Sequence, residues 1–344
     1  MKSLFLLILL CPLTMWAQSN DTISIMEWNV ENLFDCRHDT LKNDYEFLPQ
    51  GTRYWNYYRY HQKLDKIAKT IVAATGNWNP PVLIGLCEVE NDSAMIALTR
   101  YSALRECGYR YVMTHSPDIR GIDVALLYQR DRFKLIGYDS IRIEPPKGFR
   151  ATRDILHVTG LVTTTDTLDL FIVHAPSRSG GEIASLPYRL HCIGALMKGI
   201  EQLRQVRKEP KIIIMGDFND FPESPSIREV MNALPPDANI KNDKLYHLLA
   251  RQSKLNNTGT YKYQGEWNLL DHFMVSGTLL NTQKAIYTSE QMAKILHLPF
   301  LLVEDKAYGG IRPFRTYYGM KYENGFSDHL PILMQIVIKA DNNN

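Results

Sequence analysis

Short runs of apolar residues alternate with amphipathic segments along the chain. Continuous apolar runs bounded by turn-forming residues predict buried strands, and apolar side chains spaced three and four apart predict helices. The predicted strands are 23–30, 82–89, 109–113, 124–128, 156–164, 168–174, 211–215, 272–275 and 331–338. The predicted helices are 60–72, 94–106 and 187–206. Because no repeat or linker interrupts this alternation, the pattern favours one α/β domain with two sheets.

The N-terminus carries a different pattern. Lys2 gives a short positive start, residues 4–10 are all apolar, and Ala17 is a small residue after the apolar run. This arrangement is typical of a secretory signal peptide, and the apolar run is too short to span a membrane; the alternative is a buried N-terminal helix. We therefore expect a signal peptide at 1–17 and one domain at 18–344. The mature protein would be an exported monomer, periplasmic or extracellular, without stable membrane insertion.

Composition and charge narrow the classes of protein. Hydrophobic residues make up 45% of the chain and charged residues 22%, which excludes a disordered chain, a collagen-like fibre and a coiled coil. The 39 basic and 37 acidic residues give a formal net charge of +2. This balance argues against a protein held to nucleic acid by bulk charge. A near-neutral chain still acts on a polyanion when metal ions supply local positive charge.

Four cysteines remain after removal of the signal peptide, which contains Cys11. They allow three pairings, and the sequence does not choose among them. Buried thiols and a single bridge in an oxidising compartment are both compatible with the pattern. No CxxC pair occurs, so a structural zinc site is not expected. The remaining cysteines are Cys36, Cys87, Cys107 and Cys192.

Polar side chains interrupt or directly follow the predicted strands. A carboxylate in an apolar strand is costly unless charge or hydrogen bonds compensate it, and a shared cation compensates several at once. Oxygen ligands suit Mg²⁺, Ca²⁺ or Mn²⁺, and histidines suit acid–base work or phosphate contact. Taken singly, each residue also fits a helix cap, a turn or a core ion pair. Together they favour a metal phosphoesterase site; they are Asn29, Glu88, Asp123, His174, Asp217, Asn219, Asp271, Asp328 and His329.

The order of these motifs resembles the endonuclease/exonuclease/phosphatase superfamily, whose best-known member is deoxyribonuclease I. The resemblance runs from about residue 23 to 338. It implies a four-layer α/β/β/α sandwich, with two packed mixed sheets and outer helices, and divalent-metal-dependent cleavage of a phosphate ester. The motifs are Glu-Trp-Asn29-Val, Leu-Cys-Glu88-Val, Val-His174-Ala-Pro-Ser, Gly-Asp217-Phe-Asn219, Leu-Asp271-His and Ser-Asp328-His329.

The resemblance also implies a set of metal ligands and a place for the attacking water. The metal ligands would be Glu88, Asn29 and Asp328, with Mg²⁺ as the expected ion and Mn²⁺ or Ca²⁺ as alternatives. Asp217 and Asn219 would orient or activate the attacking water and hold the phosphate.

The remaining catalytic roles fall to two histidines and two aspartates. His329 would act at the scissile phosphate, and Asp271 would orient groups around it. His174 would be the general acid, with Asp123 beside it, because a carboxylate raises the pKa of an imidazole and fixes its tautomer.

The substrate is the least determined feature. Arg120 and Arg178 are expected to contact the substrate, as is Asn219. Glu90 stands where deoxyribonuclease I has an arginine that enters the minor groove, which argues against that mode of duplex binding. Residues 53–61 are rich in aromatics and arginine, typical either of base stacking or of packing of the first helix. Residues 309–322 are either a recognition loop or a basic surface.

Three functions remain open on the sequence. The favoured one is a secreted metal-dependent nuclease on DNA or RNA. The second is an esterase of a small or lipid phosphate, such as an inositol phosphate or sphingomyelin. The third is a non-catalytic binding module, which would require lost site residues, and none is missing from the motifs.

Overall fold

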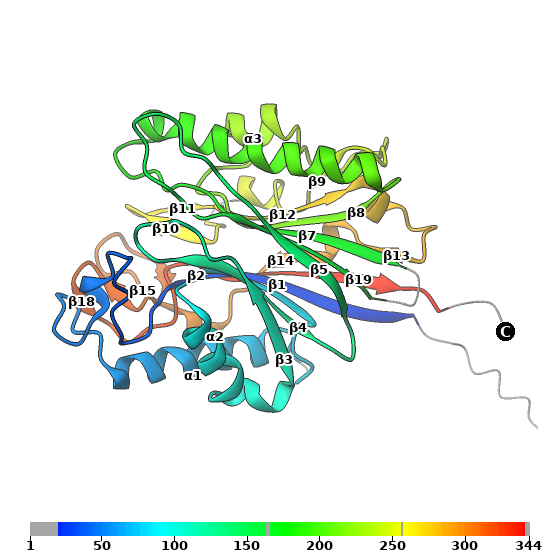
Figure 1. The fold of residues 1–344 in the computed structure, drawn as a ribbon. Helices are drawn as coiled ribbons and strands as arrows, with labels where there is room; N and C mark the ends of the chain where they lie inside the picture. Colours follow the sequence, from blue (N-terminus) through cyan, green and yellow to red (C-terminus); the bar gives the residue numbers. More distant parts are fainter. Residues whose placement is uncertain (1–19, 77, 163–165, 256, 341–344) are drawn as a thin grey trace, which may run out of the picture.

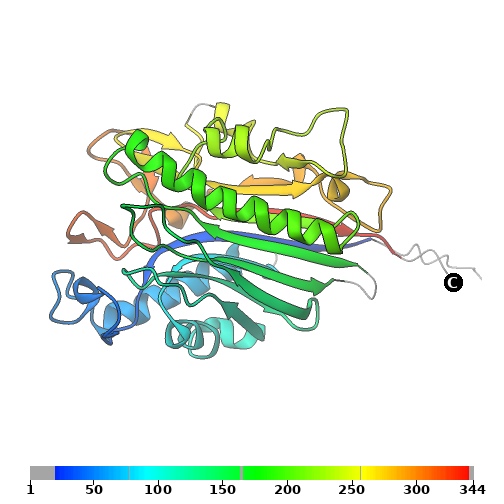
Figure 2. The same ribbon diagram turned by 45° about the horizontal axis from the view of Figure 1, so that its top comes forward.

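Two β-sheets packed face to face form the centre of the molecule in the computed structural model, which describes residues 20–340 except 77, 163–165 and 256. Helix α3 (Glu182–Val206) covers the outer face of one sheet (Figures 1 and 2). Helices α1 (Tyr57–Ala73) and α2 (Asp92–Arg100) cover the outer face of the other (Figure 1). This arrangement confirms the expected four-layer α/β/β/α sandwich.

The first sheet has seven strands in the order β13-β19-β1-β2-β4-β3, with β14 also paired to β19. Its central strands are apolar on both faces because helices cover one face and the second sheet covers the other. The strands are β1 (Asp21–Leu33), β2 (Leu83–Val89), β3 (Tyr109–Met113), β4 (Asp123–Gln129), β13 (Ile286–Tyr287), β14 (Ala293–Ile295) and β19 (Ile332–Ile338).

The second sheet has six strands in the order β5-β6-β7-β8-β12-β9. Three two-stranded hairpins lie outside both sheets and pair β10 with β11, β15 with β16 and β17 with β18. The strands of the second sheet are β5 (Lys134–Ile141), β6 (Ile155–Leu161), β7 (Thr167–His174), β8 (Lys211–Asp217), β9 (Leu245–His247) and β12 (Asp271–Ser276). The hairpin strands are β10 (Tyr261–Tyr263), β11 (Glu266–Asn268), β15 (Leu302–Glu304), β16 (Ile311–Pro313), β17 (Tyr317–Tyr318) and β18 (Lys321–Tyr322).

Two of the helices begin at asparagine caps. The side chain of Asn56 accepts a hydrogen bond from the backbone N–H of Arg59, and that of Asn91 accepts one from the N–H of Ala94. These bonds satisfy amides that a helix start otherwise leaves unpaired. Helix α1 then buries an apolar stripe at helical spacing against the first sheet, formed by Tyr60, Leu64, Ile67, Ala68 and Ile71.

Several predicted boundaries were wrong. The helix predicted at 94–106 ends at Arg100 and is followed by a separate 3-10 turn, Ala103–Cys107. The helix predicted to begin at Pro187 begins at Glu182, so the proline lies inside α3. Strand β5 was not predicted, because most of its side chains are partly or fully exposed and it lies at the edge of its sheet.

Other sequence predictions fall partly outside the described residues. The predicted signal peptide at 1–17 lies wholly outside them, and so does the end of the strand predicted at 156–164. The four described cysteines, Cys36, Cys87, Cys107 and Cys192, are free thiols. No helix among the described residues is long and apolar enough to cross a membrane.

The topology brings the ends of the central strands to one edge of the sandwich. β1 runs parallel to β2, and β7 runs parallel to β8, so each pair ends on the same side. β12 runs antiparallel to β8 and β19 runs antiparallel to β1, so both begin where those strands end. This edge lies at the end of the sandwich far from the marked C-terminus (Figure 1). Residues that are far apart in sequence therefore meet there.

Candidate active site

The polar residues singled out from the sequence lie mostly at this edge. His174 and Asp217 close the parallel pair β7 and β8, where they are register partners. Asp271 opens β12 opposite Asp217. Asn29 lies on β1, one strand away from Glu88 near the end of β2. His329 precedes β19 and completes the cluster.

His329 and Asp271 form a buried hydrogen-bonded pair at the centre of the cluster. His329 Nδ1 lies 2.7 Å from Asp271 Oδ2. Burial opposes a charge on the ring, but the carboxylates of Asp271 and Asp217 outweigh it and hold the pKa of His329 well above its ordinary value. The imidazole is therefore charged at neutral pH, with Nε2 facing Asp217 Oδ2 at 3.8 Å.

Asp217 is the carboxylate on which the cluster converges. Its Oδ2 accepts a hydrogen bond from Asn29 Nδ2 at 3.0 Å and lies 3.6 Å from His174 Nε2. Its Oδ1 accepts one from the backbone N–H of Asn219 at 2.8 Å. Burial raises the pKa of Asp217 to about 7, because Asp271 adds to the burial effect and the charge of His329 only partly offsets it. This carboxylate can accept a proton from water near neutral pH.

Backbone geometry around Asp217 explains the surrounding motif. Gly216 has φ +145°, and a Cβ there would lie 1.8 Å from the carbonyl oxygen of Val173. Only glycine fits at this close approach of β7 and β8. Asn219 has φ +51°, in the left-handed region, and its Nδ2 donates to the carbonyl oxygen of Ala175. The turn thus directs Asp217 into the cluster. The side-chain oxygen of Asn219 accepts no hydrogen bond from the described residues.

The expected pair of Asp123 and His174 is not formed. Asp123 instead accepts hydrogen bonds from the Thr114 hydroxyl at 2.5 Å and from the Ser116 backbone N–H at 3.0 Å. His174 Nδ1 is buried without a hydrogen-bond partner among the described residues. Burial, reinforced by the positive charge of Arg153, holds the pKa of His174 well below its ordinary value. His174 therefore lacks both the carboxylate partner and the raised pKa on which its predicted role as general acid was based.

Glu88 links the cluster to a neighbouring arginine. Glu88 has φ +64°, and its Oε2 accepts a hydrogen bond from the backbone N–H of Asn32 at 2.9 Å. Its Oε1 lies 3.9 Å from both His174 Nε2 and Arg120 Nη2. Arg120 also donates to the Asn32 side chain at 2.9 Å. The structure therefore brings Arg120 to the rim of the cluster, in keeping with the predicted contact with substrate.

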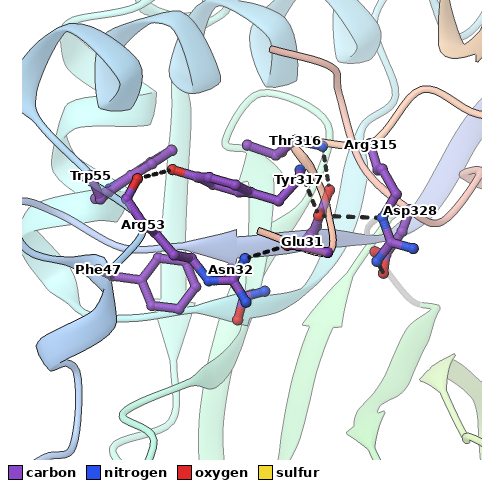
Figure 3. A pocket seen from close by; sticks show the side chains of 10 residues that line it. Glu31, Asn32, Phe47, Arg53, Trp55, Arg315, Thr316, Tyr317 and Asp328 are labelled. Carbon is purple, nitrogen blue, oxygen red and sulfur yellow. Dashed lines mark hydrogen bonds and ion pairs between the residues drawn. The ribbon is translucent and has the colours of Figure 1, made fainter. Parts of the chain in front are cut away.

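Asp328 lies beside the cluster in a group of charges that the sequence analysis did not assemble. Its Oδ2 is 2.7 Å from Arg315 Nη2, and Arg315 Nε is 3.8 Å from Glu31 Oε1. Glu31 accepts hydrogen bonds from the backbone N–H groups of Thr316 and Tyr317. Figure 3 shows Arg315 between Glu31 and Asp328. No sequence signal indicated Glu31, because it lies just beyond the predicted strand 23–30 and its left-handed backbone, φ +53°, breaks the alternation of an extended strand.

A second histidine pair lies on the opposite face of β12. His272 Nδ1 is 2.8 Å from His247 Nε2, and His272 Nε2 lies 2.9 Å from the carbonyl oxygen of Asp220. Arg189 of α3 pairs with the Asp220 carboxylate at 2.7 Å, and both are buried. These contacts fix the turn that follows Asp217. Nothing in the sequence indicated that His272, unlike its neighbour Asp271, faces away from the reaction centre.

The donor set fits a divalent cation. Asp217, Asp271 and His329 each offer a ligand atom, and these atoms lie within 4.8 Å of one another. Asp271 Oδ1 is buried without a hydrogen-bond partner in the described part of the chain. The charged His329, already paired with Asp271, is a poor ligand. Carboxylate oxygens of the site, including that of Glu88, therefore suit a hard cation, which would offset the buried negative charge.

Two other expectations concern residues outside the cluster. Arg178 pairs with Glu182 at the start of α3 and lies over the ring of Phe221, 4.3 Å from its centroid. Among the described residues it makes no ion pair or hydrogen bond with the cluster. In the aromatic segment 53–61, Trp55 and Tyr60 are buried, as the packing interpretation predicts. Tyr54, Tyr57 and Tyr58 are exposed.

Comparison with solved structures gives the same fold at low identity. D. rerio TDP2 complexed with single strand DNA product is 14% identical, with a TM-score of 0.56, over 92% of this chain and 98% of that one. The catalytic domain of human Nocturnin with bound sulfate is 16% identical, with a TM-score of 0.54, over 93% and 98%. A mannosyl-6-phosphatase of Bacteroides thetaiotaomicron is 15% identical, with a TM-score of 0.54, over 92% and 100%.

Sequence comparison identifies the family directly. No curated protein sequence matches this chain. Residues 24–338 match the profile of the Endonuclease/Exonuclease/phosphatase family, which confirms the resemblance seen in the motifs. The match spans nearly all of the described residues and includes every element that contributes to the cluster. The chain belongs to the endonuclease/exonuclease/phosphatase family and is a hydrolase of phosphoester bonds.

Proposed function

We propose that this protein is an exported, Mg²⁺-dependent phosphodiesterase that cleaves nucleic acid. The observation that carries the proposal is the pairing of a charged His329 with Asp271 beside a carboxylate, Asp217, whose pKa is about 7. A positively charged hydrogen-bond donor, His329 Nε2, and a proton acceptor, Asp217 Oδ2, thus lie 3.8 Å apart. Hydrolysis of a phosphodiester needs both, because negative charge builds on the phosphoryl oxygens while water loses a proton.

The side chains divide the chemistry between them. Asp217 would take the proton of the attacking water, and the Asn29 amide holds that carboxylate in place. His329 would donate a charge-assisted hydrogen bond to a phosphoryl oxygen, with Asp271 fixing its ring. A divalent cation held by the site carboxylates, Glu88 and Asp328 in the predicted set, would add Lewis-acid stabilisation of the phosphate.

Exposed tyrosines favour nucleic acid over a small ester. Tyr308 lines a small cavity that also contains Arg315 and Asp328, and Tyr318 lies there with the Arg312 guanidinium over one face of its ring, 4.6 Å from the centroid. Tyr54, Tyr57 and Tyr58 are exposed on the neighbouring segment. The two regions are joined, because Arg53 Nη1 donates to the carbonyl oxygen of Gly319 at 3.1 Å. Aromatic side chains beside a basic groove bind single strands by stacking on bases, and the structural neighbour TDP2 was solved with a single strand DNA product.

The test measures hydrolysis of single-stranded DNA, RNA and bis-p-nitrophenyl phosphate with Mg²⁺, Mn²⁺ or Ca²⁺ and with a chelator. Asp217→Asn is the inactive control, because it keeps the shape of the side chain and removes the proton acceptor. We expect metal-dependent cleavage of a nucleic acid that the variant loses. Turnover of the small diester alone would support the small-molecule or lipid esterase, and no turnover of any diester would overturn the proposal.

Export rests on the sequence alone. The apolar run at 4–10 and the small residue at position 17 support cleavage near Ala17, a single catalytic domain at 18–344 and a periplasmic or extracellular location. N-terminal sequencing of the protein recovered from cell fractions tests this. A mature chain that starts near residue 18 outside the cytoplasm is expected, and an intact Met1 in the cytoplasm would contradict export.

A further inference from the structure

A small polar pocket opens beside the reaction centre. Its volume is about 180 Å³, several times the ~30 Å³ that one water molecule occupies in the liquid. Asp328 lies on its wall, directly before His329 in sequence, and Asn32 lies on another wall, where its backbone N–H holds Glu88. The three groups that the proposed function places at the scissile phosphate, Asp217, Asp271 and His329, do not line it. The pocket is therefore next to the reacting phosphate and separate from it.

Arg53 is held in a fixed orientation in this pocket. Its guanidinium lies over two rings, 5.3 Å from the centroid of Phe47 and 4.9 Å from that of Tyr317. Its Nε donates to Glu46 at 2.8 Å and its Nη1 donates to the Gly319 carbonyl oxygen at 3.1 Å. Its Nη2 makes no hydrogen bond to any described residue. Figure 3 shows Arg53 with Phe47 and Trp55 on one side of the pocket and Arg315 with Asp328 on the other.

Asn32 adds a second donor in a set orientation. Its side-chain oxygen accepts from Arg120 Nη2 at 2.9 Å, so its amide N–H₂ is the group that remains, without a hydrogen bond to the described residues. Asn32 has φ +55°, a left-handed conformation that asparagine tolerates better than most side chains. The pocket thus offers N–H groups from Arg53 and Asn32, which match the oxygens of an anion.

The charges around the pocket leave Arg53 available. The buried carboxylate of Glu31 and that of Asp328 already face Arg315, at 3.8 and 2.7 Å. Buried Lys63 lies behind them, with its Nζ donating to the Thr316 hydroxyl at 2.6 Å and to the Phe326 carbonyl oxygen at 2.5 Å. The carboxylate of Glu46 is half exposed, so its pairing with Arg53 is weak in water and tolerates a second anion.

We propose that this pocket binds a second phosphate group of the substrate, one that is not cleaved, and that Arg53 is the residue that selects for it. The inference rests on the proposed function and names the class of substrate: a phosphodiester with another phosphate beside the scissile one. The pocket suits a phosphate group better than a nucleobase. The Arg53 guanidinium already covers the rings of Phe47 and Tyr317, on which a base would stack, and its N–H groups match phosphate oxygens. A polynucleotide supplies such a phosphate at every step of its backbone.

The test compares substrates that differ only in the second phosphate. They are the dinucleotide TpT and its 5′- and 3′-phosphorylated forms, pTpT and TpTp. Arg53→Gln removes the charge and keeps a planar polar group. Arg132→Gln is the matched control, because Arg132 pairs with Asp21 at 2.7 Å at the start of β1, at the opposite end of the strand from the cluster.

We expect the wild-type kcat/KM to be at least tenfold higher for one phosphorylated form than for TpT, through a lower KM. Arg53→Gln should reduce this preference to less than threefold, chiefly by raising the KM of the phosphorylated form, and Arg132→Gln should keep it. Arg53→Lys should retain part of the preference, because the charge remains and the fork is lost. Equal activity of the wild type on all three substrates, or equal loss on all three in Arg53→Gln, would overturn the proposal.

A binding measurement separates this inference from the proposed function. Calorimetry compares thymidine 3′,5′-bisphosphate with thymidine 5′-monophosphate, on the folded wild type and on Arg53→Gln. About tenfold tighter binding of the bisphosphate, lost in the variant, supports the pocket even if no diester is hydrolysed. Equal affinity for the two ligands in the wild type would refute the pocket even if nucleic acid is cleaved.

Discussion

Two adjacent residues of β12 each form a buried hydrogen bond with a histidine, and the pKa values of the histidines in the two pairs shift in opposite directions. Asp271 faces the reaction centre and hydrogen-bonds His329, whose pKa lies well above its ordinary value. The next residue, His272, faces the α3 side and contacts His247 and a backbone carbonyl group. Burial lowers the pKa of His272 from 6.5 to about 4, and the hydrogen bond to the Asp220 carbonyl group and the charge of Asp271 offset this only in part.

The comparison shows that partners, and not burial alone, decide the charge of an enclosed imidazole. Both rings are buried. His329 has a carboxylate in direct contact on one side and Asp217 at 3.8 Å on the other. His272 contacts another histidine and a backbone carbonyl group, and no carboxylate touches it to offset the effect of burial. One face of the strand therefore holds a charged group for chemistry, and the other holds a neutral pair that fixes the turn after Asp217.

Replacing His329 should have the largest effect. His329→Gln removes the charged donor to the phosphate, and we expect hydrolysis of bis-p-nitrophenyl phosphate to fall by about 10⁴-fold at pH 7. The same change in the neutral pair, His247→Gln, should leave the rate within about threefold, because that ring does not face the reaction centre. Similar losses in the two variants, at unchanged melting temperature, would show that the two pairs do not differ in role.

Removing the carboxylate beside His329 should lower the rate and move its pH dependence. Asp271→Asn should reduce kcat by about 10³-fold, because the ring loses its orientation and its charge stabilisation. The carboxylate raises the pKa of His329, so its removal lowers that pKa. Activity that needs the protonated ring should then disappear at a lower pH than in the wild type. A pH–rate profile with an unmoved alkaline limb would argue against a charged His329.

The neutral pair should make the fold sensitive to acid. Above pH 6.5 His272 is uncharged in both folded and unfolded chains, and below it the unfolded chain binds the proton first. The shift to about 4 corresponds to a loss of about 3 kcal/mol in the free energy of unfolding between pH 7 and pH 4.

Urea unfolding at pH 7.5 and pH 4.5 measures this loss. His272→Asn should show a smaller decrease between the two pH values than the wild type, even where its stability at pH 7.5 is lower. The exposed His191→Asn in α3 is the control and should keep the wild-type decrease. An unchanged decrease in His272→Asn would assign the acid sensitivity to other groups.

Much of the site was predictable because its residues occupy strand ends. Gly216, Asp217 and Asn219 form a local motif. Gly216 allows the close approach of β7 and β8, Asp217 supplies the carboxylate, and Asn219 adopts a left-handed conformation. Such a pattern is readable from residue types and spacing. The pairing of Asp123 with His174 was wrong, because Asp123 finds Thr114 and Ser116 close by in sequence, and these local hydrogen bonds satisfy it.

The pocket around Arg53 was not predictable in the same way. Residues 53–61 indicated either stacking or packing, and the structure shows both buried and exposed aromatic residues there. Arg53 becomes a candidate ligand only through the ring of Tyr317 and the carbonyl oxygen of Gly319, more than 260 residues away. Arg315 likewise acquires its role from Glu31 and Asp328.

The sequence by itself determined the alternation of strands and helices, the family and the carboxylates and histidines of the reaction centre, because apolar periodicity and short motifs are local properties. Tertiary structure decided which imidazole is charged and which arginine faces a pocket. Those properties depend on distances between groups that lie from 25 to more than 260 residues apart in the chain. Asp271 and His272 differ by one position in sequence, and only the two faces of β12 give them opposite surroundings.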